Sequence, residues 1–233
     1  PVNLDDGVMH MEGNTMPLYI KDCTLIAMAT GKRAQNLREL REYLRTISTN
    51  SIYYHFWGGL LRPRFDDPEY HNDFAIWSAH SIYNKPLAER LAVVDPVAFS
   101  SMEALRTEIL GLIEESLDET EYPVWAKRDD QFEFIQHQIV VFDTGRWVDR
   151  PEQLTEILPE LSRGSIFFHF IDARRRNENG LDDFQNWLGQ FGPPFQGMCQ
   201  AISSIDPYFS NLHKIRDALI TAVQTHQSQG AIE

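Results

Sequence analysis

Two histidines stand in matching aromatic surroundings, and their side chains are the ones best suited to chemistry. His55 belongs to the segment Ser-Ile-Tyr-Tyr-His-Phe, and His169 belongs to Ser-Ile-Phe-Phe-His-Phe. An imidazole can exchange a proton near neutral pH, and its neutral form is a common metal ligand. Each ring is therefore a candidate base or ligand, or else a core histidine with both nitrogens hydrogen-bonded. We favour the core interpretation, with Asp73 and Asp183 as the partner carboxylates.

Two further imidazoles, His71 and His80, follow the first of these histidines. The 62–72 loop beside them adds three acidic residues: Asp66, Asp67 and Glu69. Imidazoles and carboxylates together are ligands that zinc and iron accept. The spacings match no known ligand motif, however, and Leu181 and Gln190 stand at the equivalent positions after the second histidine. We therefore predict no metal centre and no cofactor.

The sequence contains no GxSxG, HExxH, GxGxxG or kinase signature, so no catalytic residue is assigned. The candidate ligand-binding residues are the histidines and their aspartates: His55, His71, His80, Asp73, His169 and Asp183. If a small-molecule site exists, we expect it near the first three histidines and the 62–72 loop. That region alone combines extra imidazoles, a longer loop and clustered carboxylates.

These histidines belong to an internal repeat. From Thr30 to Phe56, the chain matches itself 114 residues later with ten identities in 27 ungapped positions. The match resumes downstream, where Asp95-Pro96 corresponds to Asp206-Pro207. An internal repeat dictates the architecture, so we predict a tandem duplication with copies at 18–118 and 132–227. The acidic stretch 114–130 has the composition of a linker between them.

Each copy is expected to begin with a strand and continue as helices. β-branched residues precede Thr30-Gly31 and its counterpart Thr144-Gly145, which predicts a strand that ends at each Thr-Gly. Capping residues and helical spacing predict helices over 36–47, 73–82 and 85–94, one beginning at Ser51 as N-cap, and a long one from Ser100. We therefore expect a mainly α fold with small β elements, in which two modules of roughly five helices pack about an approximate two-fold axis.

Composition excludes several classes of partner. The net charge of −13 argues against nucleic acid, because the Arg174–Arg176 run is too short to supply a basic surface. No stretch approaches the roughly 20 consecutive apolar residues of a membrane span, and the first residues lack the layout of a secretion signal. We expect a cytoplasmic protein. Cys23 and Cys199 form no metal or redox motif, so we interpret both as free thiols.

The repeated strings resemble those of an uncharacterised prokaryotic family, catalogued as domain of unknown function 5752. The resemblance is carried by Ser-Ile-Tyr-Tyr-His-Phe, by Asn72-Asp73-Phe74 with Trp77, and by Asp95-Pro96, and it covers both copies. The second copy departs from the pattern with Asp182 in place of Asn72 and with Ile-Asp-Ala-Arg from Ile171. The resemblance implies an accessory or regulatory role beside glycosyltransferases and other sugar-metabolising enzymes, near which such proteins are encoded.

Two hypotheses about function follow. We expect a non-enzymatic binding or regulatory protein whose partner is another protein, with a glycosyltransferase or related enzyme as the partner that the resemblance implies. The alternative is a metal-dependent or acid–base enzyme that uses His55 with His71, His80 or Asp73. The two hypotheses differ in whether the imidazole nitrogens are free to react.

Overall fold

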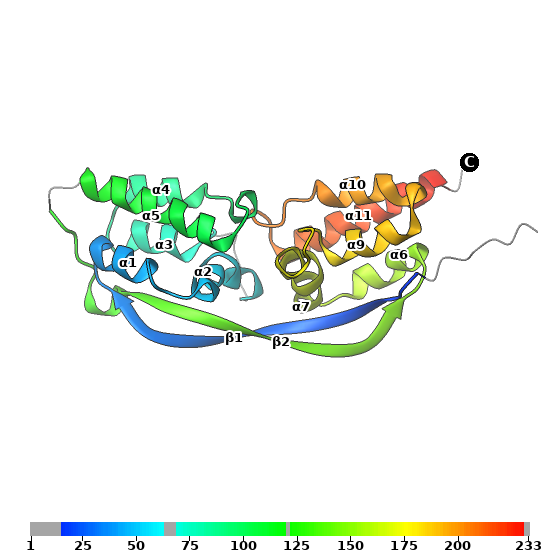
Figure 1. The fold of residues 1–233 in the computed structure, drawn as a ribbon, viewed down its shortest axis with the longest axis horizontal. Helices are drawn as coiled ribbons and strands as arrows, with labels where there is room; N and C mark the ends of the chain where they lie inside the picture. The colour runs from blue at the N-terminus through cyan, green and yellow to red at the C-terminus, as the bar shows by residue number, and fades with distance from the viewer. Residues whose placement is uncertain (1–14, 63–68, 120–121, 231–233) are drawn as a thin grey trace, which may run out of the picture.

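The computed structural model describes residues 15–62, 69–119 and 122–230, and in it a long two-stranded ribbon carries two helical lobes side by side (Figure 1). Strand β1 spans Leu18–Ala34 and strand β2 spans Phe132–Val148. They pair antiparallel along their full length, with Leu18 opposite Val148 and Ala34 opposite Phe132. Both lobes lie on the same face of this ribbon.

Among the described residues, the first lobe has the helices α1 Leu37–Leu44, α2 Thr49–Leu61, α3 Asp73–His80, α4 Lys85–Ala92 and α5 Met102–Asp118. The second lobe consists of α6 Leu154–Ile157, α7 Arg163–Ile166, a π-helical turn Phe167–Asp172, α8 Ala173–Arg176, α9 Asp183–Leu188, α10 Gln196–Ser203 and α11 Leu212–Gly230. The short 3₁₀ turns are Pro96–Ala98, Arg128–Asp130, Pro151–Gln153, Leu158–Glu160, Gly189–Phe191 and Pro193–Phe195. The prediction of a mostly helical chain with a small β component is confirmed.

Side-chain caps fix where most of the first-lobe helices begin. Asn36, Asn72 and Ser101 each accept a hydrogen bond from a first-turn N–H, as expected of N-cap residues. The prediction that Ser51 caps α2 was wrong, because Ser48 does so and the Ser51 hydroxyl instead donates to the carbonyl of Ile135 at 2.8 Å. The linker also begins later than predicted. Helix α5 continues to Asp118, so the first residues of the 114–130 stretch are helical.

The strands do not end at their Thr-Gly pairs, contrary to prediction. The pairing register shifts between Ala29 and Arg33 in β1, and again opposite the second pair. Gly31 and Gly145 adopt φ of 76° and 68°, a left-handed conformation that glycine adopts without strain. A bulge that contains such a glycine bends a strand without ending it. The Thr30 hydroxyl supports the bulge by donating to the Phe134 carbonyl at 2.6 Å.

Each strand runs beneath both lobes, so both lobes share the ribbon. Strand β1 packs on α7, where Cys23 contacts Gly164, and also on α1, while β2 packs on α2. Buried apolar residues from the ribbon and from both lobes form one continuous cluster. The largest fully buried rings include Phe56 and Phe74 in the first lobe and Phe170 and Phe184 in the second. No helix among the described residues is both long enough and apolar enough to cross a bilayer.

Candidate functional site

His55 is held at both ring nitrogens. Its side chain is 3% exposed, and Nδ1 lies 2.9 Å from Oδ2 of Asp73 at the start of α3. Nε2 accepts a hydrogen bond of 3.2 Å from the backbone N–H of Ile135 in β2. Because a backbone N–H can only donate, Nε2 must carry the lone pair and Nδ1 the proton. The neutral imidazole therefore links α2, α3 and the strand that follows the first lobe.

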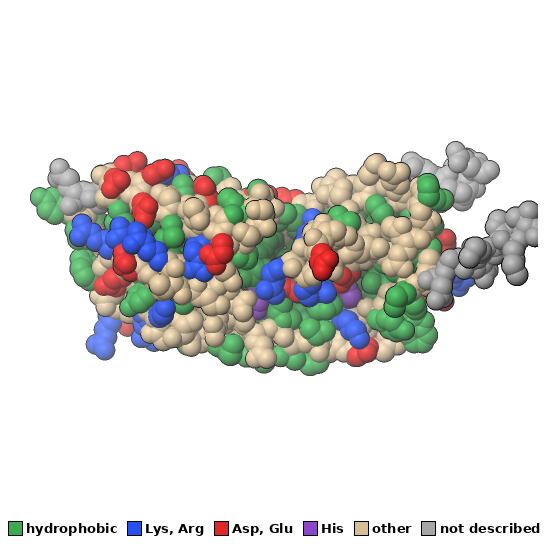
Figure 2. All heavy atoms as spheres, in the orientation of Figure 1, with side chains coloured by type: hydrophobic (Ala, Val, Ile, Leu, Met, Phe, Trp, Pro, Cys, Tyr) green, Lys and Arg blue, Asp and Glu red, His purple; other side chains and the backbone are tan. Residues whose placement is uncertain are grey.

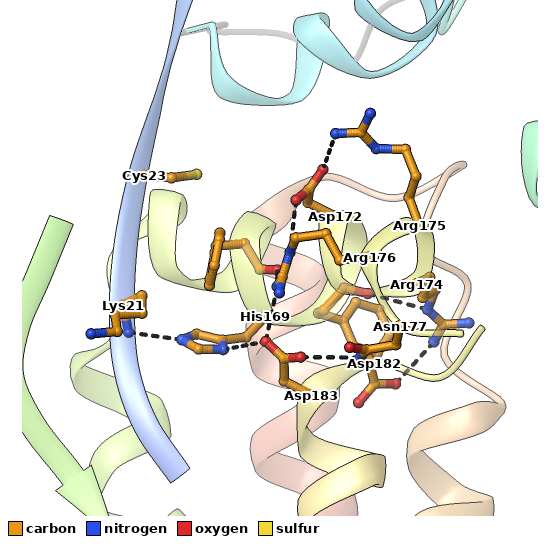
Figure 3. Close-up of polar contacts among 12 residues, drawn as sticks. Lys21, Cys23, His169, Asp172, Arg174, Arg175, Arg176, Asn177, Asp182 and Asp183 are labelled. Atoms are coloured by element: carbon orange, nitrogen blue, oxygen red, sulfur yellow. Dashed lines mark hydrogen bonds and ion pairs between the residues drawn. The ribbon is translucent and has the colours of Figure 1, made fainter. Parts of the chain in front are cut away.

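His169 repeats this arrangement in the second lobe (Figure 3). Its side chain is 2% exposed, and Nδ1 lies 2.7 Å from Oδ2 of Asp183 at the start of α9. Nε2 accepts a 2.8 Å hydrogen bond from the backbone N–H of Lys21 in β1. We call the two units, His55 with Asp73 and Ile135, and His169 with Asp183 and Lys21, the histidine clamps.

The chemistry open to the clamps follows from these bonds. A base needs a lone pair that can reach substrate, and a metal ligand needs a lone pair that points at the ion. In each clamp the lone pair of Nε2 is occupied by a backbone N–H, and the Nδ1 proton is held by a carboxylate. The predicted pairing of His55 with Asp73 and of His169 with Asp183 is present in the structure.

The structure does not bring His71 and His80 into this arrangement. The half-buried His71 ring packs against Tyr208 and Phe209, and the exposed His80 ring lies 6.2 Å from the ring of Tyr70. Within residues 15–62, 69–119 and 122–230, no group of three or more His, Cys, Asp or Glu side chains is placed to hold a metal ion. Asp66 and Asp67 lie outside the described residues. A shallow hollow of about 260 Å³ borders His55, Asp73 and Arg62.

The carboxylate of the second clamp is further enclosed by cations and donors. Burial acts to raise the pKa of Asp183, but the hydrogen bond from His169 and the charge of Arg176 outweigh it, and the pKa is lowered. Arg176 lies 3.0 Å from Asp183, and the amide of Asn177 donates to the other oxygen at 3.1 Å. Asp183 is therefore held as a charged acceptor.

A second buried carboxylate, Asp172, organises the basic run that follows the π-helical turn. Its side chain is 1% exposed and lies 2.9 Å from Arg176 and 3.1 Å from Arg175. The hydroxyl of Tyr53 in the first lobe donates to the same carboxylate at 3.3 Å. Sequence reasoning missed this group. The i,i+3 and i,i+4 spacing of Asp172 to the two arginines was the signal that could have found it.

Arg174, the first arginine of the run, has its own buried partner. Arg174 lies 3.2 Å from Asp182, whose side chain is fully buried and caps α9. Burial raises the pKa of Asp182 to about 6, although Arg174 and the Gln185 N–H act to lower it. Asn72, which caps α3 in the first lobe, carries no charge. The replacement of the capping asparagine of the first lobe by Asp182 in the second lobe therefore introduces an ion pair with Arg174.

A cleft of about 570 Å³ opens where the two lobes meet. Tyr53 and Trp57 of α2 and the start of α5 form its first-lobe side, and Arg174 and Arg175 lie on its second-lobe side. On the face shown in Figure 2, Lys and Arg side chains gather at this junction. Its lining includes none of the three histidines and no residue of the 62–72 loop near which we predicted a small-molecule site, and nothing in the structure tests that prediction.

The fold and the sequence of this chain are both similar to those of known proteins. The fold is similar to that of OrfY from Thermoproteus tenax, with a TM-score of 0.77 and 25% identity over 91% of this chain and 96% of that one. No curated protein is similar enough to count as a match. The sequence of residues 15–224 matches the family of unknown function DUF5752. The chain therefore belongs to the DUF5752 family.

Proposed function

We propose that the chain is a non-enzymatic binding or regulatory protein of the cytoplasm, and that it acts on a protein partner. The kind of partner we propose is a carbohydrate-active enzyme such as a glycosyltransferase, which is the association that the family resemblance implies. The rival hypothesis is a metal-dependent or acid–base enzyme built on the first-lobe histidines. The two hypotheses make different demands on the imidazole rings.

The observation that supports a binding role is the use of both nitrogens in each histidine clamp. A reactive imidazole would have to release the Ile135 or the Lys21 N–H before it could accept a proton or a metal. Leaving a buried backbone N–H without a partner costs on the order of 1–3 kcal/mol. A structural role, in which the rings hold the ribbon against the helices, carries no such cost.

We also propose that the two lobes arose by tandem duplication, with units at 18–118 and 132–227 related by a pseudo-two-fold axis. The support is a set of contacts that recur at the same offset of 114 residues. Ile135 stands 114 residues after Lys21, and both donate to a clamp histidine. Thr30 and Thr144 likewise donate to the carbonyls of Phe134 and Ile20 at 2.6 Å. In this arrangement the strand of each unit donates a backbone hydrogen bond to the histidine of the other unit.

The proposed function is tested by capture and reconstitution. The full chain is used as bait in extract from its native cytoplasm, and a captured glycosyltransferase or related enzyme is then purified and mixed with it. We expect a defined complex by size-exclusion chromatography with light scattering, and a change in the rate of the partner enzyme. Failure to recover any carbohydrate-active enzyme, or no complex with purified components, would overturn the proposed partner.

Metal analysis separates the rival hypothesis. Protein purified without an affinity tag is analysed for zinc and iron by mass spectrometry, beside a His71→Ala, His80→Ala double variant. We expect substoichiometric metal in both samples. A stoichiometric metal that is lost from the double variant would establish the metal-dependent enzyme and refute the non-enzymatic proposal.

A further inference from the structure

The cleft between the lobes has one basic and one apolar side. Arg174 and Arg175 of the second lobe line the basic side, and Trp57, Phe99 and Met102 of the first lobe line the apolar side. Its volume of about 570 Å³ lies within the range of roughly 300–1,000 Å³ in which proteins hold small molecules. The cleft therefore has the size and the mixed lining of a ligand site.

Arg175 is held in place but retains capacity to bind. Its guanidinium lies 4.6 Å from the centroid of the Tyr53 ring and 3.1 Å from Asp172, while its side chain is 39% exposed. Asp172 is shared with Arg176 at 2.9 Å, so one carboxylate faces two guanidinium groups. A guanidinium has five N–H donors, and one contact with Asp172 leaves others for a ligand. An arginine already fixed by a ring and a carboxylate loses little freedom on binding.

The first turn of α5 adds a second source of positive potential. Ser101 and Met102 line the cleft, and α5 is 17 residues long. The Ser101 hydroxyl already accepts from the Ala104 N–H, and Glu103 of the same turn is paired with Arg106, so what this turn adds is the helix dipole, which favours an anion beside it. Glu178 is the acidic residue on the lining and opposes this potential at one position. The basic groups on the lining are Arg174, which is paired with Asp182, and Arg175, which is paired with Asp172.

One lining residue of the cleft is smaller than its counterpart in the second lobe. In the second lobe, Tyr208 follows the matching proline Pro207, is 1% exposed and lies 4.9 Å from the ring of Trp57. In the first lobe, Val97 follows Pro96, lines the cleft and is 39% exposed. Tyr208 thus packs against Trp57, whereas the smaller Val97, at the counterpart position, lines the cleft.

We propose that the cleft binds a small organic anion. Its phosphate or carboxylate group is held by Arg175 and the first turn of α5, and its ring or apolar portion lies against Trp57, Phe99 and Met102. Charge-assisted hydrogen bonds to a fork-shaped donor suit both anionic groups. The inference goes beyond the proposed function and does not depend on any protein partner, so its test can fail while the capture experiment succeeds.

The binding experiment uses the full chain and four small probes: phenyl phosphate, benzoate, inorganic phosphate and phenol. Binding is measured by isothermal titration calorimetry. We expect one saturable site for phenyl phosphate or benzoate, with phenol and inorganic phosphate each at least about 10-fold weaker, because each lacks one half of the recognised chemistry. No saturable binding of either aromatic anion would overturn the proposal, as would phenol binding as tightly as phenyl phosphate.

Two variants locate the site, each with a matched control. Arg175→Met removes the charge, and Arg146→Met removes a charge of similar exposure that is paired with Glu160 and does not line the cleft. Val97→Tyr fills the cleft as Tyr208 fills its own position, and Val93→Tyr places the same ring at a residue 75% exposed elsewhere. We expect Arg175→Met and Val97→Tyr to weaken binding at least about 10-fold, and the controls to stay within about 3-fold of the parent chain.

The steric variant decides the outcome if Arg175→Met fails to fold. Val97→Tyr leaves the Asp172 network intact, and its fold is checked by circular dichroism. If a folded Val97→Tyr protein bound the aromatic anion as tightly as the parent chain, the cleft would not be the site and the proposal would be wrong.

Discussion

Each clamp histidine joins three pieces of chain that lie far apart in sequence. The ring of His169 connects its own helical segment, Asp183 at the start of α9 and the backbone of Lys21 in β1, 148 residues away. Both ring nitrogens are 2.7–2.8 Å from their partners and the side chain is 2% exposed. In this setting, loss of the ring removes one partner of a half-buried carboxylate and the partner of the Lys21 N–H.

Removal of a clamp ring should therefore destabilise the fold. We expect His169→Ala and His55→Ala to lower the free energy of unfolding by about 2–4 kcal/mol each, from the lost hydrogen bonds and the space left behind. Urea unfolding followed by circular dichroism measures the change. His80→Ala, at an exposed position, is the control and should change stability by less than about 0.5 kcal/mol. Clamp variants as stable as this control would show that the rings are not structural.

Asp182 should give the stability of the chain a pH dependence of unusual sign. Its pKa is raised from 3.8 to about 6, because burial outweighs the Gln185 N–H and Arg174. Between these two values the folded state holds the proton that the unfolded state releases, so stability falls as pH rises from about 4 to about 6. The size of this effect is on the order of 3 kcal/mol at most, from 1.36 kcal/mol per pKa unit.

The variant Asp182→Asn isolates this contribution. Asparagine keeps the capping oxygen, as Asn72 does in α3, but cannot ionise. The free energy of unfolding of the variant relative to the parent chain should rise between pH 4 and pH 7. Asp206→Asn, at an exposed residue that accepts a hydrogen bond from the Tyr208 N–H, should show no such rise. Contributions from groups that do not interact with Asp182 cancel in this comparison, whereas Asp183, whose charge helps to raise the pKa of Asp182, responds to the substitution as part of the same effect. A relative stability that stays constant with pH would contradict the assignment.

Among the elements, the helices were more predictable than the strands. Capping residues are local signals: α1 begins after the predicted cap Asn36 and α3 begins at the predicted Asp73, while α5, predicted from Ser100, begins at Met102 with Ser101 as its cap. The length of the strands depends on pairing between β1 and β2, which sequence patterns do not report. Gly31, predicted with Thr30 as the end of a strand, has a positive φ and forms a bulge within a strand that continues to Ala34.

The candidate site was predictable only where its residues repeat. The histidine–aspartate pairs were expected because both members recur in both halves of the sequence. The Asp172 cluster and the cleft occur once, and they depend on how α2 meets the 167–180 segment in space. The Arg174–Arg176 run was visible, but it was weighed only as a surface for nucleic acid. A buried ion-pair network was a further possibility for the same run.

The packing of α7 against β1 leaves no space for a side chain at Gly164. A Cβ added to Gly164 would overlap the Cys23 carbonyl oxygen and the Asp22 carboxylate. The Cys23 thiol also lies 3.3 Å from the Gly164 carbonyl. We therefore expect Gly164→Ala to separate the helix from the strand and to cost at least about 1–3 kcal/mol of stability, the usual range for overpacking.

A helical glycine elsewhere supplies the matched control for this variant. Gly111 lies in α5, and a Cβ added there would meet nothing within 4 Å. Gly111→Ala should raise stability by about 0.5–1 kcal/mol, because alanine favours the helix. Thermal unfolding of the two variants should therefore shift in opposite directions. A Gly164→Ala protein as stable as Gly111→Ala would show that α7 does not pack closely on β1.

At the scale of the whole molecule, the lobes depend on each other through the ribbon. The clamp in the first lobe needs Ile135 from β2, and the clamp in the second lobe needs Lys21 from β1. Phe132 and Phe134 of β2 are buried beside His55, at ring distances of 4.7 and 6.1 Å. Neither lobe therefore completes its core with its own strand alone.

Dividing the chain between the lobes tests this dependence. We expect fragments 15–119 and 122–230, produced separately, to give no folded monomer, because each lacks the strand that closes its core and satisfies its clamp. A strand left without its partner exposes a full row of N–H and C=O groups, so the isolated fragments should associate or aggregate. Mixed at equal concentration, they should form a 1:1 complex with the circular dichroism spectrum of the intact chain. Either fragment alone appearing as a monomer with a cooperative unfolding transition would show that the lobes are independent, and that the ribbon connects two finished domains and is not the core of one.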